Sequence, residues 1–384
     1  MSFKDIPVPC HHCGGALHTV AGFAALRRVT SDCRAWDAGG CLAVCTACGL
    51  AQKPADAVWH AEAAAIYADY AIYHQSGGAE QRVFTVAAGH RAEPRSLRLL
   101  KQALPHLSLS AEGRMVDIGC GNGELLRSFS GLMPGWTLAG CELGDLHRGA
   151  IEAIPGVERL YVGSVAALPG RFDLVTMVHC LEHVPNPTGF LAMVREKLAP
   201  DGALLIEVPQ WQSNAFDLVI ADHCSHFTAL SLGAVVAAAG FRVDRLHDDW
   251  IAKEMTLIAR PAPGTERPVQ DAGCADAMRD LRGALGWLTA LAEQAQSVIE
   301  GPFGIFGTSI AGTWLSAQVN GRQAFFVDED PARVGSSYLG SPVLAPDSVP
   351  AGAAVLVAQP RALAESIVRR LAGRPVRYVL PPEA

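Results

Sequence analysis

Apolar and polar residues alternate in a regular way between residues 111 and 260. Short apolar runs that end in Gly or a polar residue are typical of buried parallel strands, and stretches with apolar residues every three or four positions are typical of helices. The predicted strands are Met115–Ile118, Trp136–Cys141, Leu160–Val162, Phe172–Val178 and Ala203–Val208. The predicted helices include Glu124–Phe129, Phe190–Leu198 and one that ends at Gly240-Phe241. This alternation predicts an α/β fold with a parallel sheet.

A smaller α/β pattern follows toward the C-terminus. Residues 261–274 begin Pro-Ala-Pro-Gly-Thr-Glu-Arg-Pro and predict a linker, because Pro and Gly interrupt regular structure. Ala275–Ile299 then has leucines every three or four residues, which predicts a helix. The strands predicted after it are Phe303–Phe306, Ala324–Val327, Ala354–Ala358 and Val376–Leu380.

Composition and charge narrow the class of protein. The 384 residues are 50% hydrophobic and 18% charged, and 31 Lys and Arg against 38 Asp and Glu give a net charge of −7. This balance argues against nucleic-acid binding driven by net charge. No apolar run approaches the ~18 residues of a membrane span, and the first residues lack the apolar core of a signal peptide. We therefore expect a soluble, cytoplasmic protein.

Cysteines are concentrated near the N-terminus, where six of the 11 lie in the first 48 residues. Cys10-His-His-Cys13 and Cys45-Thr-Ala-Cys48 form two Cys-x2-Cys pairs, each followed by a glycine that permits a tight turn. Four thiolates suit tetrahedral Zn²⁺ and leave no open coordination position. We predict a structural Zn²⁺ site, whose metal supplies folding energy to a segment too small for a good core.

Alternatives to this ligand set remain open. The 31 residues between the pairs exceed the ~15–20 that are common in zinc ribbons, so an inserted hairpin is expected there. One alternative is a set of buried thiols without metal. Another is replacement of a ligand by a nearby residue, for which the candidates are His11, His12, Cys33 and Cys41.

A glycine-rich turn follows the first strand of the central pattern. Val116–Gly123 reads Val-Asp-Ile-Gly-Cys-Gly-Asn-Gly and lies between a predicted strand and helix, where small residues let a cofactor approach the backbone. The absence of Gly-Lys-Ser/Thr excludes a P-loop, and the Gly-x-Gly-x-Gly spacing differs from the dinucleotide Gly-x-Gly-x-x-Gly. About twenty residues later a strand ends in Glu142, which is placed to accept both hydroxyls of a ribose.

These segments together resemble the class I S-adenosylmethionine-dependent methyltransferases. The resemblance comprises Val116–Gly123, Glu142, the Leu-Glu-His-Val-Pro-Asn-Pro segment at 181–187 and Leu-Ala-Pro-Asp-Gly at 198–202, in matching order and spacing. It implies a Rossmann-like core that binds S-adenosyl-L-methionine.

The same resemblance implies where the cofactor binds. The glycine turn would approach the methionine part, Glu142 would hold the ribose, and Ser164 with Val165 would lie near the adenine. Many members of the family carry Asp in place of Ser164. His183 is an alternative catalytic residue, although this Glu-His pair more often shapes the loop. The implied cofactor-binding residues are Asp117, Gly119, Cys120, Gly121, Glu142, Ser164, Val165 and His179.

Two flanking segments extend the resemblance to the three-domain sugar C-methyltransferases. They are the tyrosine-rich Ile66–Gln81 and Phe216–Thr228, which contains Asp222-His223. Those enzymes have a zinc-binding head, a methyltransferase core and a C-terminal α/β domain, and they methylate the carbon beside a ketone of a nucleotide-linked sugar. Their Glu-His pair at the place of Asp222-His223 supplies the proposed base, and Ala221 replaces a histidine that often precedes the pair.

The chemistry of carbon methylation supports a role for His223 beside the resemblance. A weakly acidic C–H must lose a proton, and an enolate oxygen must be stabilised. A histidine oriented by a carboxylate, here predicted to be Asp222, can take the proton. The candidates for stabilising the enolate are Tyr70, Tyr73 and His74. The alternative is a solvated Asp-His pair at a helix start, with Asp222 as the N-cap.

The C-terminal pattern contains a second glycine turn, Gly307-Thr-Ser-Ile-Ala-Gly312, between a strand and a helix. Gly307 and Gly312 could cradle a diphosphate at the helix N-terminus, which by the resemblance would belong to a nucleotide-sugar. The alternative is a lid that has lost its ligand. NAD binding is less favoured, because the glycine pattern is incomplete and no residue set for hydride transfer is evident.

The sequence thus predicts five regions. They are a zinc-binding head (1–60), a helical connector contributing to the active site (61–110), an S-adenosylmethionine-binding core (111–260), a linker and helix (261–300) and a C-terminal Rossmann-like domain (301–384). The expected function is methylation of a carbon next to a ketone of a nucleotide-activated sugar. The alternatives are O- or N-methylation of another small metabolite, or a non-catalytic cofactor-binding scaffold.

Overall fold

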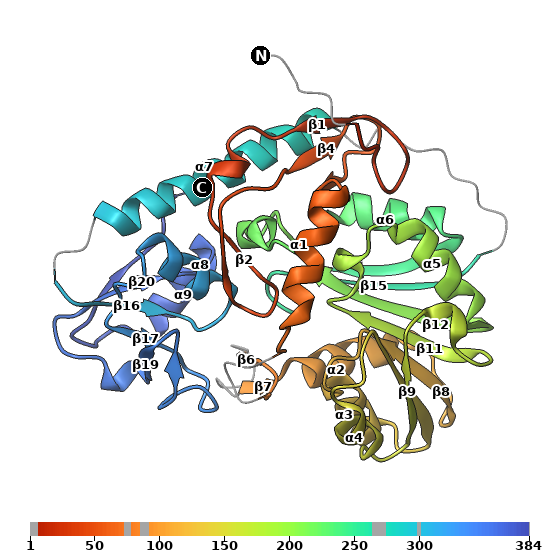
Figure 1. Ribbon diagram of the computed structural model, residues 1–384. Coiled ribbons are helices and arrows are strands. Elements are labelled where there is room, and N and C mark those ends of the chain that lie inside the picture. The colour runs from red at the N-terminus through yellow and green to blue at the C-terminus, as the bar shows by residue number, and fades with distance from the viewer. Residues whose placement is uncertain (1–6, 73–77, 85–91, 263–273, 298–300, 384) are drawn as a thin grey trace.

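The computed structural model describes residues 7–72, 78–84, 92–262, 274–297 and 301–383. Figure 1 shows a large α/β region on one side and a smaller one on the other, with the N-terminal head above them. Helix α7 (Cys274–Ser297) runs along the top between the head and the smaller region. The predicted α/β class agrees with this arrangement.

A seven-stranded sheet forms the centre of the large region. Its strands are β8 (Gly113–Ile118), β9 (Trp136–Glu142), β10 (Val157–Val162), β11 (Phe172–Val178), β12 (Leu198–Pro209), β14 (Phe241–His247) and β15 (Glu254–Pro261). They lie in the order β10-β9-β8-β11-β12-β15-β14, and β15 is antiparallel to both neighbours. The strand order reverses between β8 and β11, and α/β sheets bind ligands at the carboxyl ends of the strands beside such a switch point.

Helices cover both faces of this sheet, which explains the apolar runs of its inner strands. Successive residues of β11, Leu174 and Val175, are both fully buried and belong to clusters on opposite faces. One cluster contains residues of α2, α3 and α4, and the other contains residues of α5 and α6. These helices are α2 (Arg95–Leu107), α3 (Glu124–Leu132), α4 (Arg148–Glu152), α5 (Pro187–Glu196) and α6 (Ala229–Ala238).

The predicted strands of the core are all present, and β11 has the predicted bounds. The strands β14 and β15 were not predicted. The edge strand β14 buries only its first residue, and polar residues such as Arg242 and Asp244 interrupt its apolar pattern. An edge strand with one neighbour does not need the continuous apolar run of a central strand.

The head shares its sheet with the large region. Strands β1 (Leu17–Thr19), β4 (Ala43–Cys45) and β5 (Ala51–Gln52) pair with one another, and β13 (Ser225–His226) pairs with β5. A separate hairpin of β2 (Arg28–Val29) and β3 (Ala35–Trp36) lies between the cysteine pairs, as predicted, after a short 3-10 helix η1 (Phe23–Ala25). Backbone hydrogen bonds therefore join the predicted head to the predicted core.

The segment between the head and the core contains one long helix and a hairpin. Helix α1 (Ala57–Ala68) begins after Asp56, whose side chain accepts a hydrogen bond from the Trp59 N–H. The Trp59 indole N–H donates to the carbonyl of Ala221, which fixes α1 beside the segment before β13. A hairpin of β6 (Arg82–Phe84) and β7 (Ala92–Pro94) precedes α2.

The C-terminal region is a second, mostly parallel sheet. Its strands are β16 (Phe303–Phe306), β17 (Phe325–Val327), β18 (Ser337–Tyr338), β19 (Ser341–Leu344), β20 (Ala354–Val357) and β21 (Arg377–Val379). They lie in the order β18-β19-β17-β16-β20-β21, with helices α8 (Ile310–Gln318) and α9 (Arg361–Arg370) and the 3-10 helix η7 (Pro346–Ser348) between them along the chain. Most of the predicted linker falls on residues 263–273, which lie outside the described residues.

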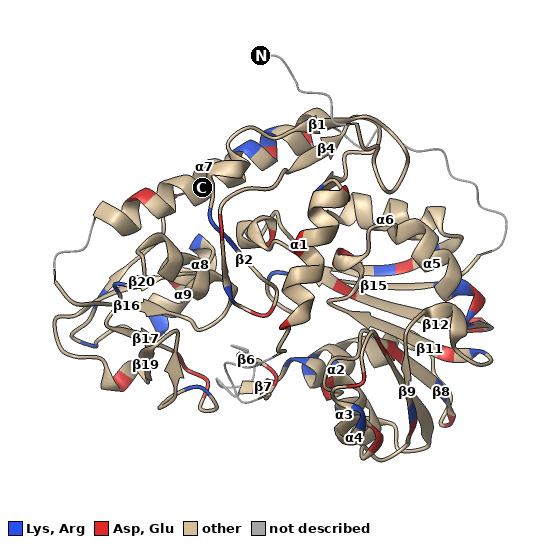
Figure 2. Cartoon of the chain, viewed as in Figure 1, with Lys and Arg blue, Asp and Glu red and all other residues tan. Residues whose placement is uncertain are grey.

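Helix α7 joins the head to the C-terminal region through one hydrophobic core. Its predicted stripe is confirmed, because Leu281, Leu285, Leu288 and Leu291 are all buried. The same core contains Phe23 of the head and Trp314 of α8. Lys and Arg positions are interspersed with Asp and Glu positions in both α/β regions (Figure 2). Within the described ranges, every helix is too short or too polar to cross a membrane.

Candidate active site

The glycine turn after β8 has a backbone that favours glycine at three positions. The φ angles of Gly119, Gly121 and Gly123 are 74°, 54° and 88°, in the left-handed region. A Cβ added to Gly119 would lie 3.0 Å from Cys180 Sγ, and one added to Gly121 would lie 2.8 Å from Ile72 Cδ1. The turn can approach its neighbours this closely only without side chains.

Two other residues of the predicted turn support it from inside. Asp117 is buried, and one of its carboxylate oxygens accepts a hydrogen bond of 2.6 Å from the Thr176 hydroxyl of β11. Burial raises the pKa of Asp117 to about 7. The Cys120 side chain is also buried, against Gly140 of β9. The side chains of Asp117 and Cys120 both lie beneath the turn. A ligand would therefore contact the glycines of the turn and neither of these side chains.

Glu142 lies beside the turn, at the carboxyl end of β9. One carboxylate oxygen accepts a hydrogen bond of 2.7 Å from the Gly121 N–H, and the other accepts one of 2.9 Å from the Leu143 N–H. The side chain is only partly buried. The structure therefore brings the predicted turn and the predicted acidic residue together at the switch point.

The predicted adenine residues differ in their access to solvent. Ser164 is exposed, and its hydroxyl caps the 3-10 helix η4 (Val165–Ala167) by accepting a hydrogen bond from the Ala166 N–H. The Val165 side chain is buried in the core of the sheet. Of the two side chains, only that of Ser164 is accessible to a ligand.

His179 lies at the carboxyl end of β11 with φ of 50°. Its Nδ1 is 3.0 Å from Glu182 Oε1, and its Nε2 contacts the Arg95 guanidinium. Burial and the charge of Arg95 hold the pKa of His179 well below its usual range. Both ring nitrogens are thus engaged within an ionic cluster that also contains Glu207 and Glu254.

The 3-10 helix η5 (Leu181–His183) connects the glycine turn with His223. Its N-cap, Cys180, contacts the glycine turn, and its last residue, His183, packs edge-on against His223 with ring centroids 4.5 Å apart. The turn and the predicted base therefore lie on either side of one short helix.

His223 is oriented by Asp217 of the 3-10 helix η6 (Ala215–Val219), and the predicted pairing with Asp222 is wrong. His223 Nδ1 is 2.7 Å from Asp217 Oδ1. Asp222 instead accepts hydrogen bonds from the Ser31 N–H and hydroxyl at 2.9 and 2.5 Å. The two neighbouring side chains face different elements because the chain turns at residues 221–222.

The alternative prediction for Asp222, a solvated helix cap, is wrong as well. Asp222 is fully buried, and the N-cap of α6 is Thr228. Burial alone would raise the pKa of Asp222, but the nearby His183 and His223 rings and the Ser31 hydrogen bonds hold it below its usual value. Asp222 acts as a buried link between the head and the segment that carries His223.

Asp217 binds a second histidine through its other oxygen. His226 Nδ1 is 2.7 Å from Asp217 Oδ2, and His226 Nε2 is 2.8 Å from Lys53 Nζ. Burial lowers the pKa of His226 to about 4, and burial lowers that of Lys53 to about 7. Against the opposing effect of burial, His226 and His223 hold the pKa of Asp217 below its usual value.

Among the described residues, Tyr67 reaches the site, and the sequence did not single it out. Its hydroxyl is 2.9 Å from His183 Nδ1. The predicted Tyr70 stacks obliquely on Tyr67, with ring centroids 5.6 Å apart. The other two predicted residues, Tyr73 and His74, lie outside the described residues.

Sequence reasoning missed Asp217, Lys53 and Tyr67. Asp217 had a usable signal, because it is an acidic residue inside the apolar run Ala-Phe-Asp-Leu-Val-Ile-Ala. A charge within such a run is buried and needs a partner. Lys53 had no comparable signal, because its partners lie more than 160 residues away.

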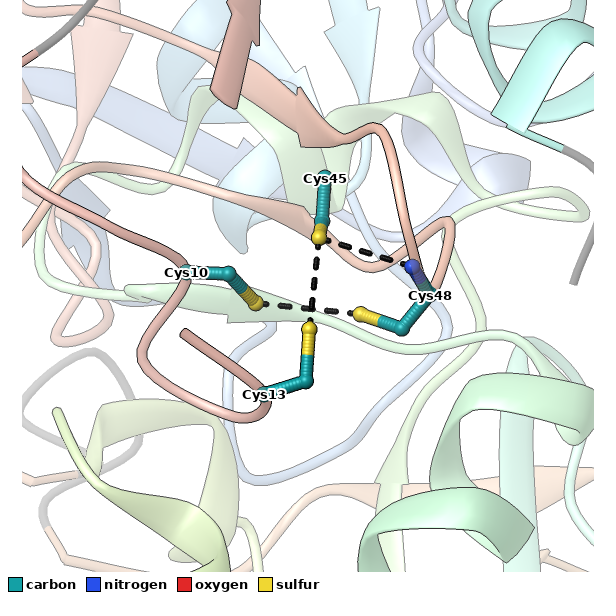
Figure 3. A group of neighbouring side chains, drawn as sticks. All are labelled: Cys10, Cys13, Cys45 and Cys48. Atoms are coloured by element: carbon teal, nitrogen blue, oxygen red, sulfur yellow. Dashed lines mark hydrogen bonds between the residues drawn. The ribbon is translucent and has the colours of Figure 1, made fainter. Parts of the chain in front are cut away.

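The four cysteines of the head converge, as predicted (Figure 3). Cys10 Sγ is 3.7 Å from Cys48 Sγ, and Cys13 Sγ is 3.5 Å from Cys45 Sγ. A tetrahedral zinc with bonds of about 2.3 Å places its sulfurs roughly 3.8 Å apart. Backbone N–H groups of residues 47 and 48 also point at Cys45 Sγ. The cluster therefore has the geometry and donor set that could hold zinc.

The alternative ligands have other partners. His11 Nε2 is 2.9 Å from the Ser225 hydroxyl, and His12 Nδ1 is 2.6 Å from the Thr188 hydroxyl. Cys33 and Cys41 lie outside the cluster. The two histidines of the first Cys-x2-Cys pair thus contact β13 and α5 of the large region.

Residues 88–246 match the protein family described as methyltransferase domain. The matched segment runs from before α2 into β14 and includes the glycine turn, Glu142 and His223. Residues 88–246 are a methyltransferase domain. Two segments that contribute to the site lie outside it, namely the head with Lys53 and helix α1 with Tyr67.

Two relatives show how far the similarity extends. The C-methyltransferase NovU of Streptomyces niveus is 28% identical over 178 residues, which cover 43% of this chain and 41% of that protein. The ubiquinone biosynthesis O-methyltransferase of Thiobacillus denitrificans is 32% identical over 123 residues, which cover 29% of this chain and 50% of that protein. The chain spans half or less of the length of these curated relatives.

Among solved structures, the methyltransferase CalO1 of calicheamicin biosynthesis, in its SAH-bound form, is 20% identical and has a TM-score of 0.35. The similarity covers 42% of this chain and 54% of that chain.

Proposed function

We propose that this chain transfers a methyl group from S-adenosylmethionine to a carbon next to a ketone, with His223 as the general base. The observation that carries the proposal is the state of the His223 ring. Its Nδ1 is bound to Asp217, while no residue in the described part of the chain forms a hydrogen bond with its Nε2. A neutral imidazole held in this way has one nitrogen available to take a proton.

The residues around the switch point fit the cofactor. The backbone of Gly119 and Gly121 would accept the methionine part, and the Glu142 carboxylate would accept the ribose hydroxyls. Ser164 would contact the adenine. When bound, S-adenosylmethionine supplies an electrophilic methyl group on a positively charged sulfur.

His223 and its neighbours account for the proton and the negative charge. His223 Nε2 would take the proton from the carbon beside the ketone, and the electrons of that C–H bond would become those of the new C–CH3 bond. The Tyr67 hydroxyl and His183 are two described groups near His223 that can donate a hydrogen bond, so we assign them to the enolate oxygen. Roles for Tyr70, Tyr73 and His74 remain predictions.

A nucleotide-linked sugar is the acceptor class that we propose. Support comes from the resemblance to the three-domain sugar C-methyltransferases and from the similarity to a C-methyltransferase. The second glycine turn adds no support. The Thr308 N–H, which a diphosphate would need, donates to Asp328, and a Cβ on Gly312 would lie 2.1 Å from the Gly307 carbonyl oxygen. Gly312 therefore serves the packing of α8 on the turn.

We also propose that the four-cysteine cluster binds a structural zinc ion. Cys10 and Cys48 pack in the same core as strands β8 and β11, so the metal would stabilise the attachment of the head to the sheet.

A second candidate is methylation of a hydroxyl oxygen. The similarity to ubiquinone biosynthesis O-methyltransferases favours it, because a histidine base can also deprotonate a hydroxyl group. In that case His223 keeps its role and only the acceptor atom changes.

The test is incubation of the zinc-loaded chain with S-adenosylmethionine carrying a 13C-labelled methyl group and with a panel of keto-sugar nucleotides and hydroxylated metabolites. We expect a mass gain of one methyl group and a product 13C shift typical of a C–CH3 group. A shift typical of O–CH3 would overturn C-methylation in favour of the second candidate.

A companion experiment tests the base. In deuterated water, the proton beside the ketone should exchange in wild type and in the control His106→Asn, which changes an exposed histidine of α2. His223→Asn should lose the exchange. Full-rate exchange in His223→Asn would remove His223 from the mechanism.

A further inference from the structure

Lys53 is a fully buried lysine of the head that the proposed mechanism does not use. It follows β5, and its ammonium group reaches into the segment that carries His223. Its Nζ is 2.7 Å from the Ile220 carbonyl oxygen, 2.8 Å from the His223 carbonyl oxygen and 2.8 Å from His226 Nε2. All three partners come from the large region, while Lys53 comes from the head.

The number of partners defines the protonation of His226. Below the pKa of about 7 to which burial lowers Lys53, its side chain is an ammonium group with three N–H donors and no acceptor. It then satisfies these three partners only if His226 Nε2 accepts. A neutral His226 then carries its proton on Nδ1, which donates to Asp217 Oδ2. The opposite tautomer would place a lone pair of Nδ1 against that carboxylate oxygen.

Asp217 determines the protonation of His223 in the same way, because a carboxylate can only accept hydrogen bonds. The carboxylate accepts from both imidazoles, one at each oxygen. His223 therefore carries a proton on Nδ1, and a neutral ring then has its lone pair on Nε2. The three contacts that connect these side chains measure 2.7 or 2.8 Å. The four side chains, those of Lys53, His226, Asp217 and His223, are all buried.

We propose that Lys53 is a positioning residue that, by way of His226, keeps Asp217 an ionised acceptor and thereby holds His223 in the Nδ1–H tautomer. The proposal rests on the proposed function only in that the freed Nε2 is the base. Lys53 also anchors the backbone on both sides of the base, because it holds the carbonyl groups of Ile220 and His223. The head thus determines the chemical state of a residue in the core.

The ring tautomer can be measured directly, by 15N NMR of protein labelled at histidine, with His223 assigned from the spectrum of His223→Asn. Wild type should show a protonated Nδ1 and an unprotonated Nε2 at His223. Lys53→Met keeps the length of the side chain without its charge. Without that charge the buried Asp217 can take up a proton and donate it to His223 Nδ1, so this variant should give a mixture of tautomers. Methyl transfer should fall by at least about tenfold, toward the roughly 10²–10⁴-fold contribution of a general base.

A matched control separates this role from general stabilisation. Lys197 also donates to two carbonyl groups, those of Ala166 and Leu168, and has no histidine partner in the described structure. Lys197→Met should leave the His223 signals unchanged. If Lys53→Met gives the wild-type tautomer, or if wild type carries the proton on Nε2, the proposal is wrong.

A second pair of variants covers the case in which Lys53→Met does not fold. In His226→Gln the amide can still accept from Lys53 and donate to Asp217, so the His223 tautomer should be retained. In His226→Leu it should be lost, and equal spectra for the two would overturn the proposal. Because the tautomer is read without substrate, a wild-type rate of methylation in His223→Asn would refute the proposed function and leave the tautomer result standing.

Discussion

His183, which is partly buried, and His226, which is fully buried, are histidines whose protonation is coupled to folding. Burial, with the neighbouring His223, lowers the pKa of His183 to about 4, and burial, with Lys53, lowers that of His226 to about 4. An unfolded histidine has a pKa of about 6.5. Between these values the unfolded chain binds protons that the folded chain does not. The free energy of unfolding must therefore fall as the pH decreases from about 6.5 to 4.

We expect this pH dependence to be measurable by urea denaturation at pH 7.0, 5.5 and 4.5, with metal content recorded at each pH. His226→Gln removes one titrating group, which accounts for up to about 3 kcal/mol at pH 4, so its stability should decline less than that of wild type. The exposed control His106→Gln should follow wild type. Identical slopes for His226→Gln and wild type would contradict the neutral state of His226.

Glu142 offers a test of the cofactor site at a single side chain. Glu142→Gln removes the charge that favours hydrogen bonds from ribose hydroxyls but keeps the shape of the side chain. Hydrogen bonds to charged groups contribute about 1.5–3 kcal/mol, so we expect S-adenosylmethionine to bind at least about tenfold more weakly in calorimetry. Glu158→Gln, on the exposed end of β10, is the control. Equal affinity in wild type and Glu142→Gln would refute the ribose assignment.

At the scale of single residues, the sequence indicated which residues belong to the site better than it indicated which side chains they contact. The Gly119–Gly123 turn and Glu142 were predictable because local spacing fixes them beside consecutive strand ends. The partner of His223 was not, because adjacency in sequence favoured Asp222 while the turn at 221–222 directs the two side chains apart. Side chains from the head, such as Lys53, depend on long-range packing that no local pattern shows.

At the scale of elements, the pairing of β5 with β13 links the four-cysteine cluster to the proposed base. Cys45 and Cys48 flank the turn that leads from β4 into β5, and β5 pairs with Ser225 and His226. His226 in turn contacts Asp217. Loss of the metal should therefore loosen β5 first and His223 next.

We expect purified protein to contain about one zinc per chain by mass spectrometry. Cys13→Ser and Cys48→Ser should be insoluble or lose the metal, because three ligands do not complete a structural site. Cys41→Ser, which changes a cysteine outside the cluster, is the control. A soluble, metal-free wild type with full cofactor binding would contradict the structural role of zinc.

Elements with a continuous apolar run were predictable in both place and type. The strands β11 and β16 have their predicted bounds, because residues buried on both faces leave an uninterrupted pattern. The two-residue strand β13 was not predictable. It exists only because β5 lies beside it, and its sequence, Ser-His, has no strand pattern.

At the scale of the whole molecule, one hydrophobic core spans the head, α7 and the C-terminal sheet. Trp314 of α8 is fully buried in it, packs edge-on against Phe216 of η6 and donates its indole N–H to the Arg27 carbonyl of the head. The order of the regions was predictable from the sequence. The hydrophobic core that these regions share was not predictable. The apolar stripe of α7 indicates that the helix packs against something, but it does not indicate which elements it packs against.

Trp314→Ala tests whether these regions unfold together. The substitution should destabilise the protein by about 3–5 kcal/mol, as expected for a large aromatic removed from a core. We expect calorimetry to show one transition in wild type, at a higher temperature than in the variant. Leu230→Ala, an exposed position on α6, is the control. A variant that shifts only a separate C-terminal transition would contradict the shared core.

The β5–β13 pairing also has a consequence for the order in which the chain folds during its synthesis. All four cysteines of the cluster lie within the first 48 residues, whereas Ser225 and His226 leave the ribosome much later. At about 5–20 residues per second, the edge of β5 waits roughly 10–35 s for its partner. Zinc would thus be loaded on a nascent chain whose methyl-transfer site does not yet exist, and the free strand edge is the point at which chaperones or misfolding would act.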